Sequence, residues 1–339
     1  MKQALPTLGL AIGAVFVAWQ VAAPVIGRAD VKVVPSPTVA GAPALPSAAP
    51  MTAASASPAA PAPQPPLRLL EGVDPKLLLQ KAFEAVDGYG SVAAKLRQRG
   101  DIFGTSMIGS GTYLQGSTAG HRLRLEMTFQ VGDRKASIQQ IADGEYLWIR
   151  RELVSAPTLW RISIDRVLAI QDQALPHQPF RNGFVLGLGG LPRLLIGLQR
   201  CVAFDTVAET TLGQMPVVVL RGKWRKESLG HLLPDQLEKI RAGEEPDLTK
   251  LTEQLPDEFW VFLGRDDLFP YRFEYRRTAA SQEVKHGETP LLKTLMALEF
   301  YEVQINESID ITLFTFERGE NDFQDETNEF IYRHNVWPN

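Results

Sequence analysis

The stretch Arg122-Leu123-Arg124-Leu125-Glu126-Met127-Thr128-Phe129-Gln130-Val131 decides the fold predicted for this chain. Apolar and polar side chains alternate along it, and a period of two is typical of a β-strand with one buried and one solvated face. Because successive side chains of a strand point to opposite faces, the apolar groups share one side: Leu123, Leu125, Met127, Phe129 and Val131. The stretch therefore predicts a half-buried strand of an antiparallel sheet.

The same period of two continues on both sides of this strand. Further strands are predicted at residues 136–141, 145–150, 161–164, 216–224, 259–263, 271–276, 295–305 and 309–316. The Asp143-Gly144 turn and the short connections between the early strands favour antiparallel hairpins. An amphipathic helix is predicted to precede the strands, because Asp74 and Pro75 are a typical N-cap and first helical residue.

Two helical segments are predicted to interrupt the strands. The first follows a glycine cluster at 187–190 and is apolar on nearly every side over residues 193–198, so we expect it to be buried. The glycine cluster lacks the spacing of a nucleotide-binding loop, and we interpret it as a tight turn into this helix. The second segment, residues 234–255, is charged and has no apolar run long enough for a core. We expect it to form a helical insert on the surface, near residues 230–256.

The first 66 residues differ in composition from the rest of the chain. Residues 5–26 are an apolar run without charge between Lys2 and Arg28, and this run is long enough to span a bilayer. We predict that residues 1–29 are a transmembrane anchor, with a cleaved signal peptide as the alternative. Residues 30–66 are rich in Pro, Ala and Ser and predict a disordered linker. The folded domain is expected at residues 67–339.

Composition and motif spacing exclude several functional classes. The chain of 339 residues has a formal net charge of −4 and a pI near 5.8, so it has no overall basic field to hold nucleic acid. Its five histidines are far apart, and its one cysteine, Cys201, is not part of a metal-binding motif. The sequence contains neither a Gly-x-Ser-x-Gly elbow nor a phosphate-binding loop. We therefore expect no cofactor, no metal, no catalytic residues and no enzymatic activity.

A series of short motifs lies in order between residues 75 and 330. They are Gly111-x-Tyr113-x-Gln115, Arg122-Leu123-Arg124-Leu125-Glu126, Ile141-Ala142-Asp143-Gly144-x-x-Leu147-Trp148-Ile149, Gly189-Gly190-Leu191-Pro192, Leu255-Pro256-Asp257, Leu263-Gly264-Arg265-Asp266-Asp267-Leu268-Phe269-Pro270-Tyr271-Arg272-Phe273-Glu274-Tyr275 and Asp325-x-Thr327. In this order the motifs resemble the LolA-like family of bacterial envelope proteins, whose best-known members carry lipoproteins across the periplasm. The resemblance implies an α+β fold in which a curved antiparallel sheet forms an incomplete β-barrel closed by helices. It also implies that the concave side of the sheet receives lipid.

The resemblance and the apolar strand face together lead to a functional hypothesis. We expect a non-enzymatic protein that binds lipid or lipoprotein acyl chains in an apolar cavity within the bacterial cell envelope. The N-terminal helix would anchor it in the inner membrane with the domain in the periplasm, and a cleaved signal would instead release it into the periplasm. The residues expected to line the cavity are Leu123, Leu125, Met127, Phe129 and Val131, with Ile138 and Trp148 on neighbouring strands.

Two alternatives to this hypothesis stay open. The same apolar side chains can meet the helices and fill an ordinary core, which alternation alone does not distinguish from a cavity. The domain can also be a sensory or interaction module that contacts an envelope protein, as do LolA-like domains that bind an anti-sigma partner. In that case the insert at residues 234–255 is a candidate partner surface.

Overall fold

The computed structural model describes residues 66–102, 105–152, 157–173, 186–251, 255–278, 292–319 and 322–335. The predicted anchor at residues 1–29, and residues 30–65 of the predicted linker, lie outside this described part. Among the described helices, none is both long and apolar enough to cross a lipid bilayer.

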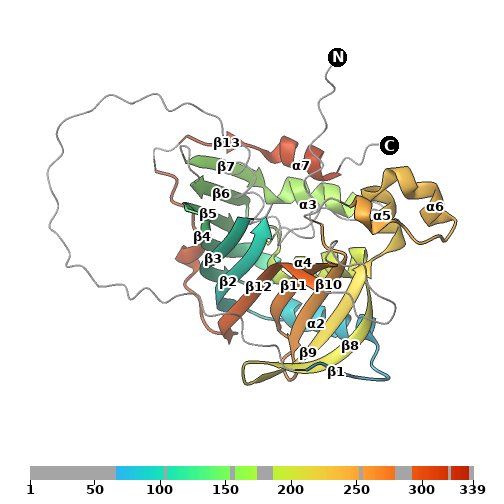
Figure 1. The fold of residues 1–339 in the computed structure, drawn as a ribbon. Coiled ribbons are helices and arrows are strands. Elements are labelled where there is room, and N and C mark those ends of the chain that lie inside the picture. Colours follow the sequence, from blue (N-terminus) through green and yellow to red (C-terminus); the bar gives the residue numbers. More distant parts are fainter. Residues whose placement is uncertain are drawn as a thin grey trace, which may run out of the picture.

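One sheet of thirteen strands organises the described residues (Figure 1). Neighbouring strands lie in the order β1-β8-β9-β10-β11-β12-β2-β3-β4-β5-β6-β7-β13. All of these pairings are antiparallel except that of β13 with β7, which is parallel. The strands are β1 (Arg68–Leu69), β2 (Val92–Ile102), β3 (Thr105–Gln115), β4 (Arg122–Val131), β5 (Arg134–Asp143), β6 (Tyr146–Glu152), β7 (Thr158–Ser163), β8 (Val202–Leu212), β9 (Met215–Trp224), β10 (Glu258–Gly264), β11 (Pro270–Thr278), β12 (Leu292–Ile305) and β13 (Gln324–Asp325). The predicted meander is therefore present, and it runs from β2 to β7 without a crossover.

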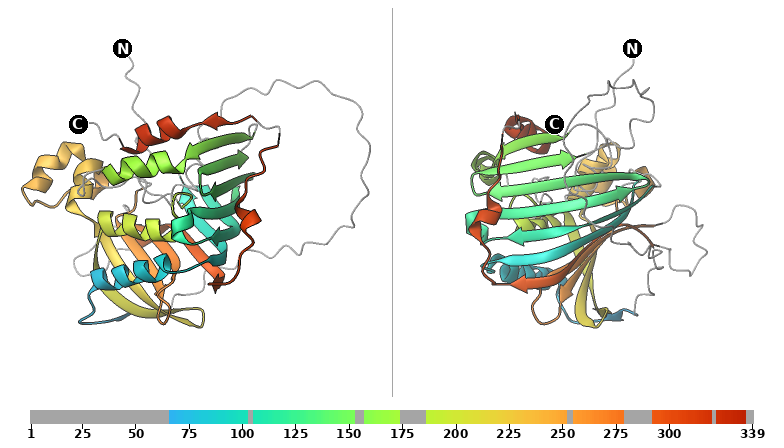
Figure 2. Two further views of the ribbon diagram at one scale, coloured as in Figure 1. Left: turned by 180° about the vertical axis from the view of Figure 1, so that it is seen from behind. Right: turned by 90° about the vertical axis from the view of Figure 1, so that its left-hand side faces the viewer.

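The sheet is strongly curved, and its helices lie along one side of it (Figure 2). Helix α2 (Pro75–Asp87) contacts α4 (Gly190–Cys201), and both contact β8. Helix α3 (Ile164–Gln173) contacts α7 (Thr327–Asn335), and both contact β7. The helices thus lie against strands near both edges of the sheet. This large curved sheet with few helices agrees with the expected α+β incomplete barrel.

The glycine cluster before α4 is a turn, as expected, and it allows close packing against β3. Gly189 and Gly190 have φ angles of +99° and +63°, which glycine adopts without the strain that a side chain would cause. A Cβ atom on Gly190 would lie only 2.7 Å from Tyr113 Oη. The backbone N–H of Leu191 donates hydrogen bonds to Tyr113 Oη at 3.1 Å and to Gln115 Oε1 at 3.2 Å. These contacts fix the buried helix α4 to the sheet.

The C-terminal segment corrects one predicted strand. Residues 309–316 contain no strand and instead include the short 3₁₀ turn η5 (Ile311–Phe314). The Asp310 side chain accepts a hydrogen bond from Thr312 N at 2.9 Å, and this local bond competes with an extended backbone. The turn contacts β4 and β5, and the chain then continues across the sheet to β13 beside β7 (Figure 2).

Short helices form the segment between β9 and β10. Helices α5 (Lys226–Leu232) and α6 (Leu237–Arg241) stand out from the sheet (Figure 1). Leu229, Leu233 and Ile240 are buried and pack this excursion onto the main core. The excursion therefore begins a few residues before the predicted insert and has an apolar base.

Candidate ligand-binding site

Six of the seven predicted site residues lie on one face of the sheet. We call it the inner face, because its side chains share a hydrophobic core with α2 and α4. Five of the six alternate along β4 and one lies on the neighbouring β5: Leu123, Leu125, Met127, Phe129, Val131 and Ile138. All six side chains are at most 4% exposed. In this part of the structure the apolar face is packed rather than hollow.

Phe129 shows how closely this face is packed. Its ring lies over Gly109 of β3, and a Cβ atom on Gly109 would be 2.5 Å from Phe129 Cδ1. Glycine at position 109 makes room for an aromatic ring, and the ring fills that room. The alternative in which the alternating side chains form an ordinary core therefore describes this region.

Trp148 lies on the opposite face of the sheet, which we call the outer face. Its ring stacks on Phe316 at a centroid distance of 5.0 Å, and its Nε1 donates a hydrogen bond to Asp143 Oδ2 at 3.0 Å. The structure thus separates Trp148 from the other six residues, which corrects the expectation that it shares their face. Leu147, Trp148 and Ile149 form an uninterrupted apolar run, so alternation does not show which of them points inward.

An apolar cleft of about 250 Å³ lies between α2, α3 and α4. Its apolar lining consists of Phe83, Ile164, Leu168, Leu188, Pro192 and Ile196. Its polar lining consists of Asp87, Thr118, His121 and Arg193. None of the seven predicted residues lines this cleft. Most cleft residues lie on helices or in the glycine turn, where an apolar period predicts burial but not which helices leave a gap.

The cleft backs onto the inner face of β5 and β6 at Gly187. A Cβ atom on Gly187 would lie 2.6 Å from Gln140 Oε1 and 2.9 Å from Leu147 Cδ1. Gln140 is buried, and its Oε1 has no hydrogen-bond partner in the described part of the chain. An unpaired buried amide oxygen costs about 1–3 kcal/mol. Gln140 is therefore a buried polar group behind Gly187 and does not itself line the cleft.

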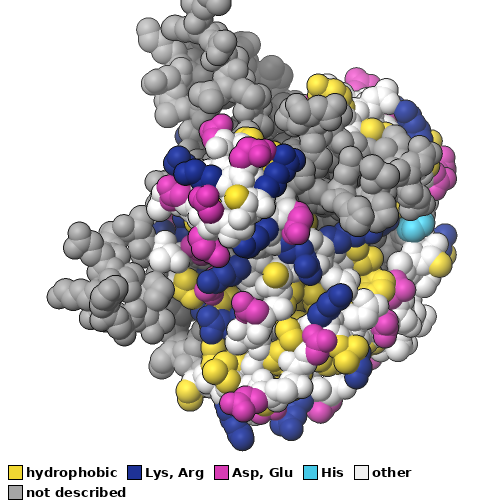
Figure 3. Space-filling model, turned by 90° about the vertical axis from the view of Figure 1, so that its right-hand side faces the viewer, with side chains coloured by type: hydrophobic (Ala, Val, Ile, Leu, Met, Phe, Trp, Pro, Cys, Tyr) yellow, Lys and Arg dark blue, Asp and Glu magenta, His cyan; other side chains and the backbone are white. Residues whose placement is uncertain are grey.

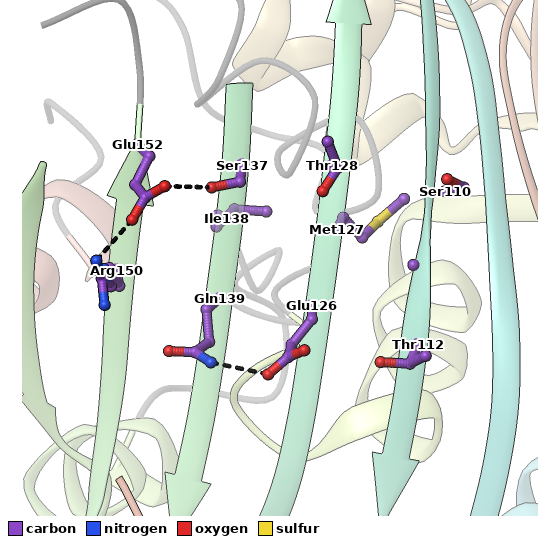
Figure 4. Close-up of a pocket in the computed structure, with 11 residues that line it drawn as sticks. Ser110, Thr112, Glu126, Met127, Thr128, Ser137, Ile138, Gln139, Arg150 and Glu152 are labelled. Atoms are coloured by element: carbon purple, nitrogen blue, oxygen red, sulfur yellow. Dashed lines mark hydrogen bonds and ion pairs between the residues drawn. The ribbon is translucent and has the colours of Figure 1, made fainter. Parts of the chain in front are cut away.

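A polar groove of about 320 Å³ crosses the outer face of β3, β4, β5 and β6 (Figure 4). Gln139 Nε2 donates a hydrogen bond to Glu126 Oε1 at 2.8 Å, and Arg150 forms an ion pair with Glu152 at 2.6 Å. Burial raises the pKa of Glu126, but hydrogen bonds from Gln139 and Arg124 outweigh it and hold the pKa below its ordinary value. These polar groups bind one another and form a solvated surface.

The described residues contain no cluster of three or more His, Cys, Asp or Glu side chains that could hold a metal ion. Cys201 is buried, and burial raises the pKa of its thiol to about 11. A thiol with this pKa is protonated at neutral pH and is a poor nucleophile. Cys201 therefore serves as a small core residue.

Charges are mixed over the face of the molecule seen in Figure 3. Lys and Arg side chains are interspersed with Asp and Glu, and hydrophobic side chains lie between them. Nucleic-acid binding requires a continuous basic patch or stripe. The described part of this face has no such stripe.

No protein-family model matches the chain, and no curated protein matches it either. Solved structures do match. The lipoprotein LppX of Mycobacterium tuberculosis is 12% identical with a TM-score of 0.36, and the match covers 70% of this chain and 97% of LppX. A LolA superfamily protein from Nitrosomonas europaea is 13% identical with a TM-score of 0.27, and the match covers 72% of this chain and 99% of that protein. The Pseudomonas aeruginosa MucA/MucB complex is 12% identical with a TM-score of 0.34, and the match covers 72% of this chain and 62% of the matched chain.

The similarity to LolA superfamily proteins is thus found in the structural comparison as well as in the sequence motifs. All three TM-scores lie below 0.5 and all three identities below 25%. Similarity at this level carries no argument about function.

Proposed function

We propose that this protein binds lipid or lipoprotein acyl chains without catalysis, and that the cleft between α2, α3 and α4 receives the chain. The observation that carries the proposal is the apolar lining of a cleft that backs onto the core of a curved sheet. Ligand sites of soluble proteins are commonly concave and mostly apolar, with a few polar groups that orient the ligand. The cleft has this composition.

The location of the proposed site differs from the one expected from alternation. The β4 side chains are already buried against one another, so a ligand gains little by contacting them. Phe83, Leu168 and Ile196 line the cleft and are only partly buried. Each methylene group that moves from water onto such side chains contributes about 0.8 kcal/mol. The cleft is therefore where an acyl chain gains binding energy.

The N-terminal residues support a location at a membrane within this proposal. Residues 5–26 are apolar and uncharged, and residues 33–66 form an uncharged segment rich in Pro and Ala. An extended polyproline segment of that length reaches on the order of 100 Å, and a flexible coil reaches roughly a third of that. A domain held in this way could collect an acyl chain from the membrane that anchors it.

The test uses the full-length protein and a fluorescent fatty acid as the probe. Ile196→Glu places a carboxylate in the cleft and is expected to weaken probe binding at least about tenfold, because the charge must be desolvated beside the acyl chain. Leu77→Glu is the matched control, since Leu77 is an exposed apolar residue of α2 that does not line the cleft. Equal affinity of the two variants, or no probe binding by the unmutated protein, would contradict the proposal.

A protein-interaction module is the second candidate function. The α5–α6 excursion projects from the sheet, and its Glu238 and Arg241 side chains are 85% and 66% exposed. A charged projection of this kind is a suitable contact surface for an envelope protein. Native mass spectrometry of the protein purified from a membrane-containing host separates the two candidates. Co-purified lipid supports the first, and an empty protein that captures a partner through the excursion supports the second.

A further inference from the structure

A second hollow lies close to the apolar cleft, at the end of the β3–β4 hairpin. It has a volume of about 420 Å³ and is lined on one side by residues 306–314 of the C-terminal segment. Three glycines and three serines contribute to its lining, together with Arg122 and Glu307. We call it the outer hollow, because Arg122 occupies an outer-face position of β4.

The cleft and the outer hollow share their walls. Between the end of β3 and the first residue of β4, Thr118 and His121 line the cleft, whereas Ser117 and Arg122 line the outer hollow. The turn between α2 and β2 is divided in the same way, with Asp87 in the cleft and residues 90–91 in the outer hollow. In both segments, residues a few positions apart line the two hollows, so the hollows are neighbours across these segments.

Arg122 is a cationic side chain of the outer hollow that pairs with no described residue. Its side chain makes no hydrogen bond or ion pair with any described residue. Arg124, two positions along the same face, differs: its guanidinium pairs with Glu126 at 2.6 Å and donates to Leu313 O at 2.9 Å. The Glu307 carboxylate also lines the hollow but forms no ion pair with Arg122. A guanidinium with free donors is suited to a carboxylate or phosphate.

Thr118 supplies a polar group between the two hollows. Its Oγ1 is buried and has no hydrogen-bond partner among the described residues. Native proteins rarely leave a buried hydroxyl unpaired, so this hydroxyl is suited to a hydrogen bond with a bound molecule. Thr118 lines the cleft, and its chain neighbour Ser117 lines the outer hollow together with Arg122.

We propose that the ligand is an amphiphile with an anionic head, whose apolar chain lies in the cleft and whose head is held at Arg122, with Thr118 contacting it at the crossing. This inference rests on the proposed function, because it assumes that the cleft holds the chain. A fatty-acid carboxylate and the phosphate of a phospholipid share the required chemistry. Neutral lipids of the same chain length lack the charged contact.

The experiment compares palmitate with methyl palmitate on the full-length protein. Palmitate is expected to bind about tenfold more tightly than the ester, since a charged hydrogen bond to Arg122 exists only for the acid. Arg122→Gln is expected to remove this preference while leaving the affinity for the ester unchanged. Arg99→Gln is the matched control, because Arg99 is exposed on β2, which β3 separates from β4, and it lines neither hollow.

The outcomes separate this inference from the proposed function. If both ligands bind with equal affinity and Arg122→Gln changes neither affinity, the anionic head does not bind at Arg122, although the cleft still binds acyl chains. If neither ligand binds, the proposed function itself fails. Inorganic phosphate is then added as a competitor for the head contact at Arg122. Displacement of palmitate that requires millimolar phosphate or more agrees with a lipid head as the ligand. Tight binding of phosphate alone, lost in Arg122→Gln, would show a site for a free anion and overturn the amphiphile.

Discussion

The inner and outer faces of β4 and β5 come from one alternating sequence, but the inner face packs into the core and the outer face contacts solvent. On the inner face, Met127 and Ile138 are paired and nearly inaccessible. On the outer face, Glu126 and Gln139 are paired one step away and join a solvated hydrogen-bond network. Alternation therefore identifies which side chains leave water. It does not reveal whether they leave water for a packed core or for a cavity.

Space remains in this molecule where helices meet one another over the sheet. Side chains on a regular strand interdigitate with those of the neighbouring strands, as Phe129 does over Gly109. Helices that lie across a curved sheet fit it less regularly, and the apolar cleft lies where α2, α3 and α4 meet. A ligand site is thus more readily formed at the helix side than on the strand.

The largest expected effect concerns the packing of the inner face. Phe129→Ala would leave a cavity over Gly109 and is expected to reduce the free energy of unfolding by about 3–5 kcal/mol. Gln130→Ala, on the exposed side of the same strand, is expected to change it by less than about 0.5 kcal/mol. Urea unfolding followed by tryptophan fluorescence measures both. Similar small losses for the two variants would show that the inner face is a loosely filled cavity.

Two buried glutamines of the inner face are expected to respond in opposite directions. Gln115 accepts hydrogen bonds from Tyr113 Oη and from Leu191 N, so Gln115→Leu is expected to destabilise the protein by about 1–3 kcal/mol. Gln140 Oε1 has no partner among the described residues, so Gln140→Leu is expected to be neutral or to stabilise by about 1 kcal/mol. Thermal unfolding of the ligand-free protein measures the difference. Equal destabilisation by the two substitutions would indicate that Gln140 is satisfied in solution.

The smallest expected effect is a pH dependence on the outer face. The pKa of Glu126 lies below its ordinary value of 4.5, so its ionised form stabilises the fold. That contribution is present above pH 4.5 and is lost as the pH falls through the lowered pKa. Because the Glu126 side chain is 39% exposed and solvent screens its interactions, we expect Glu126→Gln to cost less than about 0.5 kcal/mol at pH 7. Unfolding curves of both proteins should converge in acid, and a difference that grows in acid would reverse the assigned sign.

Much of the fold was predictable from local sequence, because strand and helix periods are local properties. The Asp74 and Pro75 signals mark the start of α2, and Asp74 Oδ1 accepts a hydrogen bond from Lys76 N at 2.9 Å. The failure at residues 309–316 has a physical cause. Ile309, Ile311 and Leu313 alternate with polar residues, but this segment contacts β4 and β5 without pairing in their ladders, and the Asp310 side chain closes a turn instead.

The candidate site was less predictable than the fold. Six of the residues chosen from alternation lie together as expected, but Trp148 lies on the other face, and the cleft is lined by different residues. Gln140 and Arg122 were within reach of a sequence argument, since each occupies a definite face of its strand. Their lack of hydrogen-bond partners among the described residues was not predictable, because it depends on which side chains from distant parts of the chain approach them.

The sequence by itself determined most of the strands, the buried helix α4 and the buried and exposed sides of β4, since each follows from residue spacing within a short segment. Only the tertiary structure decided where the apolar surfaces meet closely and where they leave a cleft. That outcome depends on how helices far apart in sequence cross the bent sheet, and volumes left between them are set by the packing of many side chains at once. The same is true of Arg122, because only the tertiary structure shows that no described residue pairs with its guanidinium.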